Sequence, residues 1–568
     1  MECDIIRDNQ IIAVVYGVLI EKRLLWDTFF IGVSVFSRAS KSSGVKSRTL
    51  ILGVALFLTL ATNGTFFKHV LEVYSLTLQT APMIASLGIV LMGVMVIVFS
   101  LFGSRYVIKP FLIFILLLSS LVAYFMSAYN IIVDTHMIQN ILETNINESM
   151  DLLSIQQVLY FLLLGVIPSI IVYRIKIATT TFKKAVIESF QSIAIALGII
   201  AVVIFTFSKF YTTFFREHKS LRFYSNPTFY LYSSGEYVQQ SFSHDMSGLQ
   251  PLGLDAHVPN GTHRKLIILV VGEAVRWDHF SLNGYGRETN PLLKKEDIVN
   301  FPQFTSCGTE TAVSVPCMFS SLGRADYNKE VAQHTENILD VLAHAGTTIL
   351  WRDNNSDSKG VAIRHTYEDY QKSDKNTMCE EGECRDEGML VGLQEYINAH
   401  PKGNIVIVLH QMGNHGPAYY KRYPKAYEKF TPVCKTNQLE QCTQAEITNA
   451  YDNTILYTDT FLTKVIDVLR KNDLTFATAM FYLSDHGESL GEKGLYLHGF
   501  PYAIAPEAQK HIPAVMWFGK QFKVNKTLLK ERAKEPYSQD FLFHTMLGMA
   551  DVNTSIYERD LDILNGVD

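Results

Sequence analysis

The sequence predicts two structural parts, a membrane domain of five α-helical spans and a soluble α/β domain. Three observations support this fold class. Apolar stretches long enough to cross a bilayer lie within the first 210 residues, and the remainder has the composition of a soluble protein. After residue 264, short apolar runs alternate with helical stretches, which is typical of a parallel sheet. Several of these runs end on carboxylate or imidazole side chains, so we expect a functional site where the strands end.

The length of 568 residues exceeds what one domain usually holds, so the chain is divided by its composition. The membrane-length stretches give a transmembrane domain at 48–209, preceded by an N-terminal extension of unclear role at 1–47. A connector at 210–263 leads into the α/β domain at 264–568. The net charge of −5 argues against nucleic acid as a partner, because binding its backbone requires a basic face.

Five segments approach the roughly 20 residues that an α-helix needs to cross a hydrocarbon core. They are Leu50–Phe66, Ala81–Phe102, Ile108–Tyr129, Gln157–Tyr173 and Ser189–Phe207. Lysine and arginine residues are concentrated before the first span, between the second and third, and between the fourth and fifth. By the positive-inside rule these loops are cytoplasmic, and an odd number of spans places everything after residue 210 outside.

Six of the seven cysteines lie in the predicted exterior part, in close pairs. Six cysteines allow fifteen pairings, and we choose neighbours by proximity. The alternative is a zinc site with thiolate ligands, but the sequence contains no C-x-x-C motif. We therefore expect an oxidising compartment and three disulfides, namely Cys307–Cys317, Cys379–Cys384 and Cys434–Cys442.

Two of the apolar runs end on residues that suit a metal ion. Lys265–Gly272 precedes Glu273, and Ala477–Ser484 precedes Asp485 and His486. Two carboxylates and one imidazole suit Zn²⁺ or a neighbouring transition ion, and they offer too few oxygens for calcium. Because adjacent strand residues face opposite ways, Asp485 and His486 can share a metal only if the backbone turns after the strand.

Gly487 permits such a turn. A solvated loop would explain an isolated Asp-His pair equally well. His415 follows another apolar run and His498 lies twelve residues beyond His486, so the whole set favours a metal site over a loop.

Thr311 is a candidate nucleophile because its surroundings read as a turn that enters a helix. A helix N-terminus offers free N–H groups and a positive dipole end, which favour an alkoxide or a phosphate. By chemistry alone Thr305, Thr309 and Ser314 are competitors. Helix capping by any of these hydroxyls is the alternative explanation of the segment.

Four motifs together resemble the lipid A phosphoethanolamine transferases, a family that includes the mobile colistin resistance enzymes. The motifs are Gly272-Glu273…Arg276 with Asn283-Gly-Tyr-Gly-Arg-Glu-Thr-Asn-Pro291, Cys307-Gly-Thr-Glu-Thr-Ala-Val-Ser-Val-Pro-Cys-Met-Phe-Ser320, Asn414-His-Gly-Pro417 and Ser484-Asp-His-Gly-Glu-Ser-Leu-Gly491. The resemblance runs from about residue 48 to the C-terminus, and it implies an alkaline-phosphatase-like or sulfatase-like α/β fold with bound zinc.

The resemblance also implies roles for individual residues. Thr311 becomes the nucleophile and a zinc ligand, together with Glu273, Asp485 and His486. His415 and His498 line the site and bind the phosphoryl group, bind a second zinc or transfer protons, and Glu488 is a candidate ligand of that second zinc. Ser356 and Lys359 match positions of the substrate pocket.

A further match lies between the third and fourth spans. Asn140, Thr144 and Glu148 are spaced to share one face of a helix and correspond to residues thought to hold the ethanolamine head group. A carboxylate facing an ammonium would explain such a role. A solvated amphipathic surface helix explains the same spacing, and the sequence leaves both interpretations open.

The resemblance implies an enzyme that transfers phosphoethanolamine from phosphatidylethanolamine to a lipid A phosphate through a phosphoethanolamine–threonine intermediate. It implies a location in the bacterial inner membrane with the catalytic domain in the periplasm, and resistance to polymyxin and colistin. We expect a monomer, although the sequence leaves the oligomeric state open. Two alternatives stay open: transfer to another envelope acceptor, such as a core sugar or a glycoprotein, and a non-enzymatic sensor of phospholipid head groups. A sulfatase is disfavoured, because its C-x-P-x-R motif is absent around Thr311.

Overall fold

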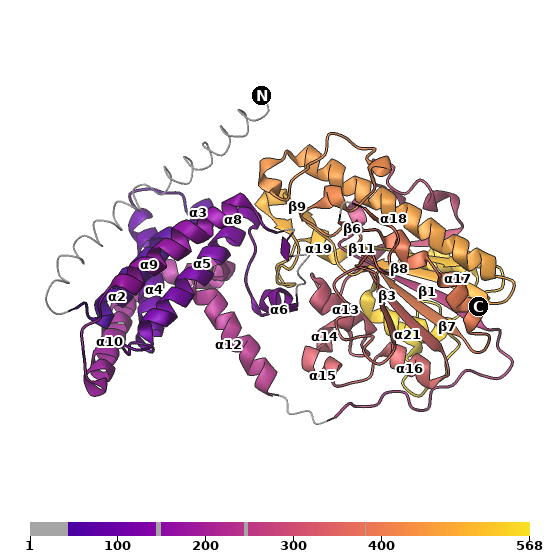
Figure 1. Ribbon diagram of the computed structural model, residues 1–568, viewed down its shortest axis with the longest axis horizontal. Helices are drawn as coiled ribbons and strands as arrows, with labels where there is room; N and C mark the ends of the chain where they lie inside the picture. Colours follow the sequence, from indigo (N-terminus) through magenta and orange to yellow (C-terminus); the bar gives the residue numbers. More distant parts are fainter. Residues whose placement is uncertain (1–43, 144–148, 151, 244–247, 381, 568) are drawn as a thin grey trace. The chain divides into compact units, whose positions relative to one another are not determined.

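The computed structural model of the protein describes residues 44–143, 149–150, 152–243, 248–380 and 382–567. It contains two compact units (Figure 1), formed by Met1–Thr135 with Leu153–Glu236 and by His136–Leu152 with Tyr237–Asp568. Nearly all of the predicted extension at 1–47 lies outside the described residues. Residues 136–152, which the sequence analysis counted with the membrane domain, group with the second unit.

The first unit is helical throughout its described part. Its helices are α2 (Ser47–Ala61), α3 (Gly64–Val73), α4 (Ala81–Ser100), α5 (Ile108–Tyr129), α8 (Ile155–Tyr160), η1 (Phe161–Val166), α9 (Ile167–Arg174), α10 (Phe182–Thr206), α11 (Ser208–Glu217), η2 (Lys219–Tyr224) and α12 (Thr228–Ser243), the last part of which belongs to the second unit. Four continuous stretches are long and apolar enough to cross a membrane: α4, α5, Ile155–Arg174 and α10. They match the second to fifth spans predicted from the sequence.

The first predicted span is bent rather than straight. The chain bends by 55° between helices α2 and α3. The described part of the unit therefore has four candidate spans, or five if the bent pair crosses the membrane as one span. Asn63 lies at the break, and its side-chain amide donates to the Leu58 carbonyl and to the Asn226 carbonyl, at 2.9 and 2.6 Å. The backbone N–H of Asn226 donates in return to Asn63 Oδ1 at 2.9 Å. The Leu58 carbonyl also accepts from the Thr62 N–H at 3.1 Å, so the Asn63 side chain adds bonds at the break and joins it to Asn226.

The second unit is built around an eight-stranded sheet in the order β12-β2-β11-β8-β1-β7-β3-β4. These strands are β1 (Lys265–Gly272), β2 (Ile298–Thr305), β3 (Thr348–Asp353), β4 (Thr366–Asp369), β7 (Ile405–His410), β8 (Ala477–Ser484), β11 (His511–Phe518) and β12 (Tyr537–Ser538). Strands β8, β1, β7, β3 and β4 are parallel, as predicted, whereas β11 runs antiparallel to both of its neighbours. Two-stranded ribbons are formed by β5 (Cys379–Glu380) with β6 (Glu383–Cys384) and by β9 (Ser489–Leu490) with β10 (Tyr496–Leu497).

Helices cover both faces of this sheet (Figure 1). They are α13 (Thr311–Phe319), α14 (Gly323–Asp326), α15 (Lys329–Gln333), α16 (Ile338–His344), α17 (Leu393–Ala399), α18 (Gln444–Asn472), α19 (Glu507–Lys510), α20 (Lys526–Arg532) and α21 (Leu542–Met549), with α6 (Thr135–Glu143) nearly all in this unit. Alternate β1 residues such as Leu269 belong to a core that includes side chains of α16 and α21, while α18 contacts β1 and β8. Burial on both faces explains why these strands read as continuous apolar runs.

The register of the parallel strands brings their carboxyl ends to one edge. Gly272 of β1 pairs with Ser484 of β8, and Val271 pairs with His410 of β7. His410 in turn pairs with Asp353 of β3. The residues that directly follow β1, β3, β7 and β8 therefore lie close together at this edge of the sheet, as the sequence analysis expected.

Three disulfides link the cysteine pairs predicted from proximity. They are Cys307–Cys317, Cys379–Cys384 and Cys434–Cys442. The first connects the loop before α13 to the body of that helix, so it constrains the segment that carries Thr311. The second joins β5 to β6.

The motif Asn283–Pro291 packs against α18 through Asp452, a fully buried carboxylate. His279 Nδ1 lies 2.7 Å from one oxygen of Asp452, while the Tyr285 hydroxyl and the Arg287 guanidinium donate to the other at 2.9 and 2.8 Å. These hydrogen bonds attach the motif to α18, so we assign the motif a structural role.

Replacing Asp452 with alanine is expected to destabilise the second unit by about 2–4 kcal/mol, because its buried partners lose their acceptor. Thermal unfolding of the purified full-length protein would show this as a fall of several degrees in melting temperature. Asp467 on the same helix pairs with Arg470 at the surface and serves as the control. Its alanine variant should change stability by less than about 0.5 kcal/mol, and equal losses in the two variants would contradict the prediction.

Candidate active site

Glu273 follows β1 directly and is fully buried at the aligned strand edge. The next residue, Ala274, has a positive φ of 55°, so the chain turns sharply there. Side chains from the end of β8 stabilise the turn: the Ala274 N–H donates to Asp485 Oδ1 at 3.1 Å, and the Val275 N–H donates to Ser484 Oγ at 2.8 Å. The end of β8 thus fixes the direction of the Glu273 side chain.

Asp485 and His486 follow β8 and are also fully buried. The His486 N–H donates to Asp485 Oδ1 at 2.7 Å, and His486 Nδ1 lies 2.8 Å from the Gly487 carbonyl. Nδ1 is therefore the protonated nitrogen, and Nε2 carries a lone pair. Gly487 is required for space rather than for a positive φ, since a Cβ there would lie 2.0 Å from the Ala508 carbonyl oxygen.

Thr311 is the first residue of α13, and its hydroxyl meets both groups just described. Thr311 Oγ1 donates to Glu273 Oε2 at 3.0 Å and lies 3.4 Å from His486 Nε2. The three competing hydroxyls donate instead to backbone carbonyls: Thr305 to Tyr537, Thr309 to Phe500 and Ser314 to Asp485. Of these four hydroxyls, that of Thr311 contacts a carboxylate and an imidazole in the part of the chain that the structure describes.

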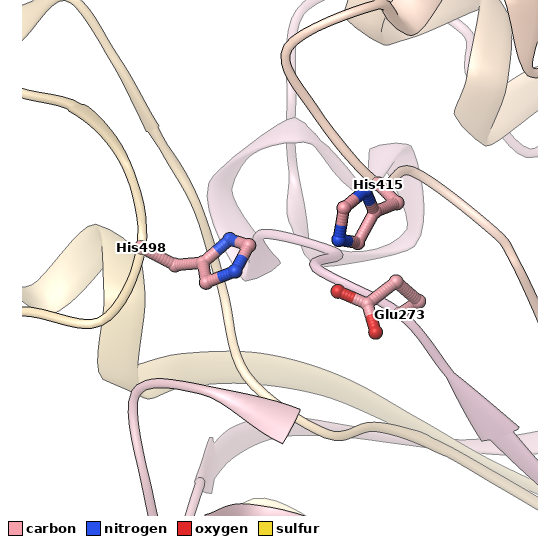
Figure 2. A group of neighbouring side chains, drawn as sticks. All are labelled: Glu273, His415 and His498. Carbon is pink, nitrogen blue, oxygen red and sulfur yellow. The ribbon is translucent and has the colours of Figure 1, made fainter. Parts of the chain in front are cut away.

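His415 and His498 lie beside Glu273, and their rings point toward a common space with its carboxylate (Figure 2). The ring of His498 is 5.8 Å from that of His415 and 4.3 Å from that of His486, measured between centroids. His415 is placed by a loop that packs on Glu273, because the Asn414 N–H donates to the Glu273 carbonyl at 3.0 Å. His498 Nδ1 lies 2.7 Å from Glu488 Oε2.

Glu273, Asp485 and His486 have the spacing of metal ligands. His486 Nε2 lies 3.4 Å from Glu273 Oε1 and 3.3 Å from Asp485 Oδ2. Ligands that bind Zn²⁺ tetrahedrally at about 2.0–2.1 Å are separated by roughly 3.3 Å. Among the described residues, neither Glu273 Oε1 nor Asp485 Oδ2 has a hydrogen-bond partner, although both are buried. Buried carboxylate oxygens without donors fit a cation, so the residues present suit the implied zinc.

Burial shifts the pKa values of the side chains in this site, and a bound cation would counter the rise at Glu273. Burial, and then the charge of Asp485, raises the pKa of Glu273 well above its usual range. Burial lowers the pKa of His486 to about 4, which leaves the imidazole neutral as a ligand must be. Burial alone would lower the pKa of His498, but the adjacent Glu488 carboxylate raises it to about 10.

Helix α6 packs against the Thr311 segment. The side-chain amide of Gln139 donates to the Ala312 carbonyl at 3.1 Å. A Cβ on Gly499, next to His498, would lie 2.7 Å from the Met137 methyl group. Asn140, the predicted head-group residue, follows Gln139 on this helix. Thr144 and Glu148, the other two predicted head-group residues, lie outside the described residues.

The loop after β3 reaches the site through Asn355, a residue that the sequence analysis missed. Its amide donates to Glu273 Oε2 and to the Gln411 carbonyl, both at 2.8 Å, and it is 2% exposed. Ser356 and Lys359, the predicted pocket residues, lie in this loop, and the Lys359 ammonium donates to the Ser356 carbonyl at 3.3 Å. Asn355 follows a strand that ends at the shared edge, so the strand-end argument could have found it.

Replacing Asn355 with alanine is expected to lower activity about 10- to 100-fold, because outer partners of metal-binding carboxylates orient their ligands. The purified enzyme should also show weaker metal affinity in a competition titration with a chelator. The matched control is Asn398 on α17, an exposed residue whose side chain pairs with Gln394. Full activity and unchanged metal affinity in Asn355→Ala would contradict the positioning role.

Comparison with known proteins identifies the family. A family model described as phosphoethanolamine transferase EptA/EptB matches residues 91–242, and a sulfatase model matches residues 265–552. The phosphatidylethanolamine transferase Mcr-2 of Escherichia coli is 43% identical over 512 residues, which cover 88% of this chain and 94% of that protein. The chain belongs to the EptA family of phosphoethanolamine transferases.

Other members of the EptA family agree over nearly the whole length. The phosphoethanolamine transferase EptA of Escherichia coli K12 is 39% identical over 544 residues, covering 93% of this chain and 98% of the relative. The solved structure of EptA from Neisseria meningitidis, an integral membrane lipooligosaccharide phosphoethanolamine transferase, superposes with a TM-score of 0.88 at 36% identity. It covers 91% of this chain and 98% of that one, so the membrane helices and the sulfatase-like domain are confirmed together.

Proposed function

We propose that this phosphoethanolamine transferase takes its group from phosphatidylethanolamine and attaches it to a lipid A phosphate. The observation that carries the proposal is the Thr311 hydroxyl, held 3.0 Å from Glu273 within a set of zinc-type ligands. The name of Mcr-2 includes phosphatidylethanolamine, and the Neisseria meningitidis relative is named as a lipooligosaccharide phosphoethanolamine transferase. Both substrates are lipids, which explains a catalytic domain joined to membrane helices.

We propose that Glu273, Asp485 and His486 hold one Zn²⁺ together with Thr311. The ion, when bound, would lower the pKa of the threonine hydroxyl and offset the negative charge of the phosphoryl oxygens. The protein's own residues then supply positioning, which is most of what phosphoryl transfer needs. The N-terminus of α13 directs free N–H groups toward the group that Thr311 attacks.

The reaction has two steps, and each exchanges one P–O bond for another. In the first, Thr311 Oγ bonds to the phosphorus of phosphatidylethanolamine while the bond to diacylglycerol breaks. Glu273 Oε2 already accepts a hydrogen bond from Thr311 and is placed to take its proton. His415 or His498 donates a proton to the departing diacylglycerol. In the second, an oxygen of the lipid A phosphate bonds to the phosphorus from the opposite side while the bond to Thr311 Oγ breaks, and Glu273 returns the proton to Thr311.

We propose that Asn140, Ser356 and Lys359 contact the substrates. Asn140 is supported by the bond between its neighbour Gln139 and the Ala312 carbonyl, which places α6 beside the nucleophile. Ser356 and Lys359 are supported by the contact of Asn355 with Glu273. Thr144 and Glu148 are included by resemblance alone.

The proposed location is the bacterial inner membrane with the second unit in the periplasm. Three disulfides support an oxidising compartment. Each transfer adds an ammonium group to the outer surface and reduces its negative charge. Cationic peptides such as polymyxin and colistin then bind more weakly, because their attraction to that surface is electrostatic.

Mass spectrometry of lipid A tests the proposal. Cells that express the protein should contain lipid A heavier by one phosphoethanolamine, and cells that express Thr311→Ala should not. An unmodified lipid A with phosphoethanolamine on a core sugar or a glycoprotein would assign a different acceptor. Phospholipid binding without any modified envelope component would favour a sensor.

A further inference from the structure

Tyr419, Glu488 and His498 form a hydrogen-bonded chain that leads into the active site. The Tyr419 hydroxyl donates to Glu488 Oε1 at 2.5 Å, and His498 Nδ1 lies 2.7 Å from Glu488 Oε2. Glu488 is 0% and Tyr419 1% exposed. Because an ionised carboxylate only accepts hydrogen bonds, both partners must be donors, and each Glu488 oxygen is engaged by one of them.

This arrangement determines which nitrogen His498 presents to a substrate. A proton on Nδ1 is directed at Glu488, so Nε2 is the nitrogen that remains for the reacting group. The His498 ring lies in the common space with Glu273 and His415 (Figure 2). A histidine whose ring plane is fixed needs no reorientation when the substrate arrives.

The backbone of Gly416 packs closely against the Glu488–Tyr419 pair. A Cβ on Gly416, the residue after His415, would lie 2.8 Å from both Glu488 Oε1 and the Tyr419 hydroxyl. Tyr419 also packs edge-on against Tyr451, whose hydroxyl donates to the Ala274 carbonyl at 2.6 Å. The chain is therefore anchored both to the loop that carries His415 and to the turn that follows Glu273.

We propose that Tyr419 and Glu488 are positioning residues that fix the orientation of the His498 ring. This inference rests on the proposed role of His498 in the transfer. Glu488 acts through its hydrogen bonds in this arrangement, and not as a ligand of a second metal. The competing arrangement is a metal held by His486, Glu488 and His498, whose ligand atoms lie within 4.8 Å of one another.

The test uses full-length protein in detergent and a phosphatidylethanolamine labelled on an acyl chain, with labelled diacylglycerol as the product. Tyr419→Phe removes one hydroxyl and is expected to lower kcat about 10-fold, while Glu488→Ala lowers it about 100-fold. The KM for the donor should stay within about threefold in both variants, because neither residue binds it. Glu488→Gln should fall between the two, since its amide oxygen can still accept from His498.

A double-mutant cycle tests whether Tyr419 affects kcat through His498. If Tyr419 acts through His498, then adding Tyr419→Phe to His498→Ala should cause no further loss of kcat. Tyr423→Phe is the matched control, because the Tyr423 hydroxyl is buried in the same segment and contacts Asn453. Its kcat should equal that of the wild type.

Three results would overturn the inference. They are an unchanged kcat in Tyr419→Phe, a full additional loss in the His498→Ala background, and a zinc content that falls in Glu488→Gln along with activity. The last would make Glu488 a metal ligand. A wild-type enzyme that releases diacylglycerol but leaves lipid A unmodified would refute the proposed acceptor without affecting this inference.

Discussion

Replacing Thr311 with alanine is expected to lower transfer by roughly 10⁴- to 10⁶-fold, the range seen when a nucleophile is removed from a site that acts as a unit. The reason is geometric. The Thr311 hydroxyl contacts both Glu273 and His486, and no other hydroxyl of its loop takes that place among the described residues. Intact-protein mass spectrometry after incubation with phosphatidylethanolamine should show one added phosphoethanolamine on the wild type and none on Thr311→Ala.

Two further variants distinguish loss of the nucleophilic hydroxyl from a general disturbance of the loop. Thr311→Ser keeps a hydroxyl at the same atom position and should retain measurable adduct and activity. Thr305→Ala removes a competing hydroxyl that contacts the Tyr537 carbonyl at 3.4 Å, and its activity should stay within a few-fold of the wild type. A phosphoethanolamine adduct that persists on Thr311→Ala would show that another residue is the nucleophile.

The strands and the metal-type ligands were predictable from the sequence because one physical rule covers both. Parallel strands buried on two faces read as apolar runs, and their carboxyl ends meet at one edge. Glu273, Asp485 and His486 follow such runs directly, and the register of β1, β7 and β8 places them together. Choosing Thr311 over Thr309 or Ser314 required the family resemblance at first, and the hydrogen bonds now supply an independent reason.

Residues that support the site from distant segments were not predictable in this way. Gln539 is fully buried, and its amide donates to the Ser484 and Asp485 carbonyls. In the sequence, however, it begins a helical turn more than 50 residues after Asp485. Tyr419 looks like any tyrosine in a loop until its contact with Glu488 is known. Asn63, at the break between α2 and α3, bonds to Asn226, which lies 163 residues away in the chain. Such pairings depend on tertiary contacts, which hydropathy and periodicity do not record.

Replacing Asp485 with asparagine is expected to remove bound zinc and to lower activity by about a thousandfold, equivalent to about 4 kcal/mol of lost charge stabilisation. Asp485 Oδ1 accepts from the Ala274 and His486 N–H groups, and an asparagine oxygen can keep both bonds. The change is then confined to Oδ2, the buried oxygen that lies 3.3 Å from His486 Nε2. Zinc content measured by atomic emission on purified protein should fall from about one ion per chain to near zero.

This substitution distinguishes a ligand from a structural carboxylate because the new amide can donate to His486 Nε2 in the metal-free protein. The melting temperature without metal should therefore stay close to that of the metal-free wild type. Adding zinc should raise the melting temperature of the wild type by several degrees, through binding to the folded state, and leave Asp485→Asn unchanged. Glu507→Gln, at an exposed carboxylate that pairs with Lys510, should behave as the wild type in both measurements. An Asp485→Asn protein that still gains stability from zinc and still transfers phosphoethanolamine would mean that the ion, if it binds here, is held by a different set of side chains.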